Sequence, residues 1–111
     1  MVRQMSKLRL KPNPTLADFQ RYIDDMVAER GFADETVAQS FMLLIEEVGE
    51  FAKAARKSEG VKLAVDAQKQ QLEHEAADVF ILLLCLCNKL GVDLEQAFRA
   101  KEEYNKQRVW K

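Results

Sequence analysis

The segment from Val79 to Cys87 constrains the fold more than any other part of this 111-residue chain, because its sequence, VFILLLCLC, is apolar at every position. It continues a helical pattern that reaches Gly91, and a helix that is apolar on all sides must be buried on all sides. The segment is far shorter than the roughly 20 residues that span a bilayer. It therefore predicts the central helix of a helical protein that does not enter a membrane, with its outer face packed on another subunit.

The first half of the chain contains signals for two helices. Thr15 with Asp18 three positions later predicts a capped helix that runs to Gly31. Asp34 can cap a second helix, which ends near residues 58–60.

The second half predicts two more helices and no strand. The third helix begins between residues 61 and 70, and Asp93 with Gln96 caps the fourth. We therefore expect an all-α domain over residues 14–111, a four-helix bundle with short connections. The apolar positions expected to face its core are Leu16, Phe19, Ile23, Met26 and Val27, then Val37, Phe41, Leu44, Ile45, Val48, Phe51 and Ala52, and finally Leu94, Ala97 and Phe98.

The charge balance argues against nucleic acid as a partner. The chain has 17 Lys and Arg against 18 Asp and Glu, so its net charge of −1 offers no basic footprint for a polyanion. Basic side chains do gather in residues 1–13, which contain no acid and run into Pro12 and Pro14. This segment is predicted to be an extended basic N-terminal arm.

The cysteines and the start of the chain both favour a cytoplasmic protein. Cys85 and Cys87 lie two apart on the apolar helix, so their side chains point in different directions and are expected to be buried, inert thiols. Such thiols suit a reducing compartment. The basic residues at the start are not followed by the apolar run of a secretory signal.

Two of the predicted helices aim carboxylates toward the core. Glu47 and Glu50 lie one turn apart on the second helix, on or beside its apolar face. Glu75 and Asp78 repeat this arrangement on the third helix. Burying an unpaired carboxylate costs several kcal/mol, so four of them must be neutralised by protons, basic partners or cations.

A hard divalent cation satisfies such a group of acids, because Mg²⁺ prefers oxygen ligands and keeps positions free for phosphates. Zn²⁺ is disfavoured, since the single histidine, His74, is expected on the surface. A di-iron bundle would need Glu-x-x-His on two helices, and the second helix has no histidine. A noncatalytic, oligomeric helical interaction module, with the acids as salt-bridge partners, remains the alternative.

The spacing Glu46-Glu47-x-x-Glu50, followed by Glu75-x-x-Asp78, resembles the EExxE…ExxD signature of the MazG and dCTP pyrophosphatase families. The strings LIEEVGEFAKAARK and EHEAADVFILLLCLCNKLGVDLEQAF are similar to the second helix of these all-α pyrophosphohydrolases and to their third helix with the turn into the fourth. The resemblance implies a homodimer or a dimer of dimers. It also implies Mg²⁺-dependent, or Mn²⁺-dependent, cleavage of a nucleoside triphosphate to its monophosphate and pyrophosphate, in nucleotide-pool house-cleaning.

The resemblance also implies roles for individual residues. Those matching the family's Mg²⁺ ligands are Glu47, Glu50, Glu75 and Asp78. Glu46 or Glu47 would orient the attacking water, and Phe32 stands where an aromatic ring contacts the base. Candidates to contact phosphate are Lys53, Lys101 and Arg108, while Asn105 could bond to phosphate or base. Base preference is left open, because Ile23 or a neighbour stands where the dCTP-cleaving branch has a histidine, and Leu82 stands where it has a tyrosine.

Overall fold

The computed structural model describes residues 5–60 and 65–109, and every regular element in these ranges is a helix. The helices are α1 (Leu16–Arg30), α2 (Val37–Gly60), α3 (Val65–Leu90) and α4 (Leu94–Lys106). The predicted all-α class with four helices is confirmed.

Local sequence signals fix the starts of α1 and α4. The Thr15 hydroxyl accepts a hydrogen bond from the backbone N–H of Asp18, and the Asp18 carboxylate accepts one from the N–H of Thr15. At α4, the Asp93 carboxylate accepts from the N–H of Gln96. Both caps satisfy donors that a helix start would otherwise leave unpaired, as predicted.

The start of α2 differs from the prediction. The expectation that Asp34 caps this helix is wrong, because Thr36 has that role two residues later. The Thr36 hydroxyl accepts from the N–H of Gln39, whose side-chain oxygen accepts from the N–H of Thr36. This reciprocal pair satisfies two donors, whereas three residues after Asp34 stands Val37, whose side chain cannot return a hydrogen bond.

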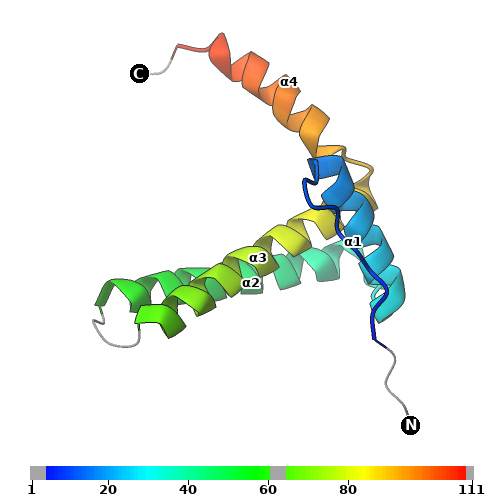
Figure 1. Ribbon diagram of the computed structural model, residues 1–111. Coiled ribbons are helices and arrows are strands. Elements are labelled where there is room, and N and C mark those ends of the chain that lie inside the picture. The colour runs from blue at the N-terminus through cyan, green and yellow to red at the C-terminus, as the bar shows by residue number, and fades with distance from the viewer. Residues whose placement is uncertain (1–4, 61–64, 110–111) are drawn as a thin grey trace.

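Helices α2 and α3 run antiparallel and side by side as a long pair, and α1 crosses one end of it (Figure 1). The hydrophobic core lies at this crossing, where Ile23 and Met26 of α1 pack with Leu84 and Cys85 of α3. Leu84 has no exposed surface. The predicted burial of the apolar α3 segment is therefore confirmed for residues 84–87 within the single chain, whereas Leu83 is 38% exposed.

A polar junction between α1 and α3 sets where α4 begins. The side-chain amide of Gln20 donates to Asn88 Oδ1 and to the carbonyl of Val92, and its oxygen accepts from the N–H of Leu94, each at 2.9 Å. Asn88 in turn donates to the carbonyl of Gln20. These bonds tie the turn before α4 to α1.

From this junction α4 extends away from the α2–α3 pair (Figure 1). One chain therefore does not close into the predicted bundle: α4 lies against α1 at its start, and the predicted inward residues Ala97 and Phe98 are exposed. The radius of gyration is 17.1 Å, whereas a compact domain of this length has one of about 13 Å.

The prediction for α2 is also wrong at one face. Phe41, Ile45, Val48 and Ala52, expected in the core, are exposed, and Met42 lies beside them. We call the exposed large residues of this face (Phe41, Met42, Ile45 and Val48) the α2 apolar face. The accessible surface of the 12.8-kDa chain is 9121 Å², about 2,800 Å² more than a compact monomer of this mass exposes.

The described part of the N-terminal arm, residues 5–13, is extended along α1 (Figure 1). Ser6 donates to the Glu29 carboxylate, Leu8 packs on the core cluster, and Lys11 forms an ion pair with Asp18. Among the helices described, none has both the length and the apolar content needed to cross a membrane.

Candidate metal centre and adjoining cavity

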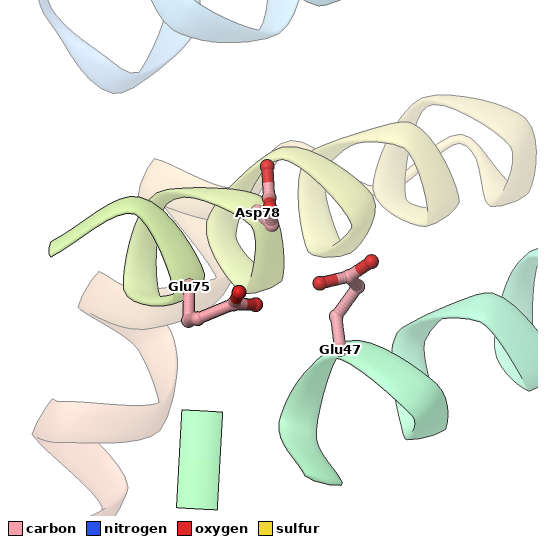
Figure 2. Close-up of side chains that lie close together, drawn as sticks. All are labelled: Glu47, Glu75 and Asp78. Carbon is pink, nitrogen blue, oxygen red and sulfur yellow. The ribbon is translucent and has the colours of Figure 1, made fainter. Parts of the chain in front are cut away.

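The antiparallel pairing of α2 and α3 brings together three of the four predicted metal ligands. Glu47 projects from α2 toward α3, where Glu75 and Asp78 lie one turn apart (Figure 2). One carboxylate oxygen from each of the three lies within 4.8 Å of the others. Glu47 and Glu75 are half-buried and Asp78 is exposed, so the cluster opens to solvent on one side.

This arrangement is electrostatically unfavourable without a cation. Desolvation raises the pKa of Glu47 above its ordinary value, and the charge of Asp78, a hydrogen bond with Glu75 and the charges of Glu75 and Glu50 raise it further. All these effects disfavour the ionised carboxylate. The three acids therefore form a site at which a positive charge would be stabilised.

The other predicted residues of α2 lie outside this cluster. Glu50 is exposed one turn after Glu47, outside the three-acid group, although its charge acts on Glu47. Glu46 and Lys53 are also exposed. The structure thus places Glu50 as a peripheral ligand candidate, and it does not bring Glu46 or Lys53 into the cluster.

The donor set fits a hard divalent cation better than a salt-bridge network. The ion pairs found among the described residues involve Asp18, Glu73, Glu95 and Glu103, and none involves Glu47, Glu75 or Asp78. Carboxylate oxygens within a few ångströms of one another are the ligands that Mg²⁺ and Mn²⁺ accept. His74 is exposed, as expected.

A cavity of about 370 Å³ adjoins the cluster, and Glu47 and Asp78 form part of its wall. Such a volume is at the small end of the range for ligand sites. The wall is mainly apolar, with Phe32 from the connection between α1 and α2, which is 46% exposed. The other lining residues are Met26, Val27, Arg30, Glu35, Leu43, Ile81, Leu82, Cys85 and Lys89.

The predicted substrate residues of α4 form a separate group. Lys101 Nζ lies 4.6 Å from the centroid of the Tyr104 ring and Arg108 Cζ lies 6.0 Å from it. Asn105 is next to this ring in sequence, and its side-chain oxygen is buried with no hydrogen-bond partner in the described part of the chain. We call Lys101, Tyr104, Asn105 and Arg108 the α4 cationic group. The cavity wall, as described, includes no residue of α4.

Sequence reasoning missed the other charged residues of the cavity wall and one aromatic residue beside the α4 cations. Arg30, Glu35 and Lys89 line the cavity, and Tyr104 lies within the α4 cationic group. For Tyr104 a signal existed, because it is spaced by three and four residues from the two predicted cations. For the other three, no local pattern distinguishes a cavity residue from a solvated helix end.

The fold and the site together define an all-helical protein in which carboxylates from two antiparallel helices lie close together beside a small cavity. The family model described as the MazG nucleotide pyrophosphohydrolase domain matches residues 33–109. This range includes all three clustered acids and the α4 cationic group. The chain belongs to this family.

Individual relatives agree with the family assignment. The chain is 34% identical to dCTP pyrophosphatase 1 of Mus musculus, over 90% of this chain and 62% of the mouse protein. It is 32% identical to a dATP/dGTP diphosphohydrolase of Salmonella phage PMBT28, over 95% of this chain but 31% of the phage protein. It is also 32% identical to the uncharacterized Bacillus subtilis (strain 168) protein YpjD, over 82% of this chain and 84% of that protein. The chain thus spans less than two thirds of the two named enzymes.

Proposed function

We propose that this protein is a Mg²⁺-dependent nucleoside triphosphate pyrophosphohydrolase that converts a ribo- or deoxyribonucleotide to its monophosphate and pyrophosphate, with a role in nucleotide-pool house-cleaning. The observation that carries the proposal is that Glu47 and Asp78 belong to the three-acid cluster and also line the apolar cavity. A nucleotide needs both environments, because its phosphates require cations and its base favours an apolar pocket. Family membership and the named activities of the mouse and phage relatives support the same reaction.

In this proposal Glu47, Glu75 and Asp78 hold the cation, with Glu50 as a further ligand at the exposed edge. When bound, Mg²⁺ supplies positive charge to phosphate oxygens and lowers the pKa of a water molecule. Glu47 orients the water that attacks the α-phosphorus by accepting a hydrogen bond from it, and Glu46 is the alternative for this role. Mn²⁺ would substitute, because it accepts the same oxygen ligands.

A second copy of the chain completes the site in our proposal. The single chain exposes the α2 apolar face. Its α4 extends away from the α2–α3 pair, which carries the carboxylates (Figure 1). The excess surface of about 2,800 Å² per chain amounts to about 5,600 Å² for two copies, which is at the upper end of what obligate dimers bury. The α4 cationic group of one copy would then contact the phosphates held by the acids of the other, while Lys53 approaches them from α2.

The reaction is tested by incubating the protein with single nucleoside triphosphates and separating the products by chromatography. We expect monophosphate and pyrophosphate, with activity lost in EDTA and restored by Mg²⁺ or Mn²⁺. Glu75→Gln and Asp78→Asn should abolish turnover, whereas Glu102→Gln, at an exposed position of α4, should retain it. A nucleoside diphosphate as the first product would refute the proposed cleavage at the α-phosphorus.

Sharing of the site between copies has its own test. Glu75→Gln and Lys101→Ala, each inactive alone, should recover up to about a quarter of wild-type activity when unfolded together and refolded at equal amounts. In a mixed dimer, one of the two sites then has intact acids and an intact α4 group. Absence of recovery, with mixed dimers demonstrated by mass spectrometry, would place both residues in the site of one chain.

A further inference from the structure

The cavity beside the carboxylates is elongated along α3. Its wall on this helix begins at Asp78, continues through Ile81, Leu82 and Cys85, and ends at Lys89. Eleven residues of helix correspond to about 16 Å along the axis. The end at Lys89 is therefore well separated from the acids, and a nucleotide with its phosphates at the acids would extend its base toward Lys89.

Two opposite charges lie at this end. Lys89 Nζ donates a hydrogen bond of 2.7 Å to the backbone carbonyl of Glu35, which fixes the connection between α1 and α2 against α3. Glu35 is half-buried and lines the cavity. Burial raises the pKa of the Cys85 thiol, the charge of Lys89 lowers it, and the charges of Glu35 and Asp24 raise it. Both charged groups thus act on a thiol in the cavity wall.

Phe32 lines the same cavity, close to Glu35 in the connection between α1 and α2. It lies three residues before Glu35, and its carbonyl accepts a hydrogen bond from the N–H of Glu35. The pairing of Lys89 with Glu35 therefore also restrains Phe32. A half-exposed aromatic ring at a cavity mouth offers a stacking partner to a planar base.

The base edges differ in how well they match a carboxylate next to a cation. Guanine has two neighbouring donors, N1–H and N2–H, beside two acceptors, O6 and N7. A carboxylate accepts two donors at once, and a lysine or arginine donates to O6 and N7. Cytosine and adenine each present one amino group to such a site. Thymine and uracil present one donor, N3–H, flanked by the O2 and O4 acceptors, so the second oxygen of a carboxylate that accepts from N3–H faces an acceptor.

We propose that Glu35 selects the base, accepting the N1–H and N2–H of guanine while Lys89 or Arg30 donates to its O6 and N7. A guanine nucleotide is then the preferred substrate, because guanine alone among these bases offers two neighbouring donors to the Glu35 carboxylate, and nucleotides with cytosine, adenine, uracil or thymine are disfavoured. This inference rests on the proposed function, since it assumes that the phosphates occupy the carboxylate cluster.

The experiment compares kcat/KM for dGTP, dCTP, dATP, dTTP and dUTP between wild type and Glu35→Gln. The glutamine has the same shape but only one acceptor, and its amide can donate to O4. We expect kcat/KM for dGTP to fall by about 5- to 150-fold, the usual range for one good base contact, while that for dUTP is unchanged or rises. Asp34→Asn is the matched control, because Asp34 is the adjacent exposed acid and is not among the residues lining the cavity.

Binding of the monophosphates separates this inference from the proposed function. By calorimetry, the wild type should bind dGMP more tightly than dUMP, and Glu35→Gln should narrow the difference. If triphosphates are hydrolysed but dGTP is not preferred, or if Glu35→Gln leaves the dGTP to dUTP ratio unchanged, the base assignment is wrong and the proposed reaction stands. If no triphosphate is hydrolysed, the reaction fails, and equal binding of the two monophosphates would then overturn the base assignment as well.

Discussion

Replacing Glu47 by glutamine should stabilise the metal-free protein while removing its activity. Glu47 shares its cluster with two other acids at separations of up to 4.8 Å. At this distance two unit charges in water repel one another by about 0.9 kcal/mol. The water value is a lower limit because Glu47 and Glu75 are half-buried, so two neighbours bring the expected gain to at least about 1–2 kcal/mol at low salt. For about 100 residues, each kcal/mol raises the melting temperature by about 4–8 °C.

The assay is thermal unfolding of wild type and Glu47→Gln at one protein concentration, with EDTA and with millimolar Mg²⁺. In EDTA the variant should melt higher, because the repulsion is gone. In Mg²⁺ the wild type should gain stability by about 1.4 kcal/mol for each tenfold excess over the dissociation constant, and the variant should gain much less. Glu102→Gln is the control, since it removes an exposed charge outside the cluster.

The opposite pattern would refute the metal-site reasoning. If the acids were salt-bridge partners in a noncatalytic module, Glu47→Gln would leave a base without its partner and lower the melting temperature in EDTA. If the wild type melts at the same temperature in EDTA and in Mg²⁺, this result would independently exclude Mg²⁺ binding at the carboxylate cluster.

Three further outcomes follow from the structure. The pKa of Glu47 is raised in the folded protein above the ordinary glutamate pKa of 4.5. The metal-free wild type should therefore lose stability as the pH rises from 4.5 through the raised pKa of Glu47, and urea unfolding should show a smaller loss for Glu47→Gln. Leu84→Ala, at a fully buried position, should cost about 2–5 kcal/mol in the same assay, and a loss below 1 kcal/mol would contradict the described core. Ile45→Glu places a charge on the α2 apolar face, at a side chain that is 69% exposed in the single chain. Light scattering should report the monomer mass for this variant and a multiple of it for wild type, whereas equal masses would show that the face is not an interface.

The helices and the carboxylate pairs could be predicted because both depend on residues within a few positions of one another. The caps at Thr15 and Asp93 need only a partner three residues on, and these predictions are confirmed. The spacing of Glu75 and Asp78 places them on one side of a helix wherever that helix packs. The one local prediction that failed chose Asp34 over Thr36, two residues that can both cap a helix.

Tertiary packing decided what the periodicity left ambiguous. Helix α2 has two apolar stripes, and only contact with α3 determines that the stripe with Leu44, Phe51 and Ala54 is covered while the one with Ile45 and Val48 is exposed. The same contact turns Glu47 toward α3, because Glu47 belongs to the covered stripe.

The direction of α4 and the charges at the end of the cavity also depend on contacts between distant parts of the chain. Gln20 and Asn88 are joined across 68 positions, and Lys89 reaches Glu35 across 54. By itself the sequence determined the helices, their caps and the pairing of acids along each helix, since a helix brings together residues three and four apart. Only the tertiary structure determined which acids meet, which apolar face stays exposed and which charges line the cavity, because those distances are set by the packing of one helix on another.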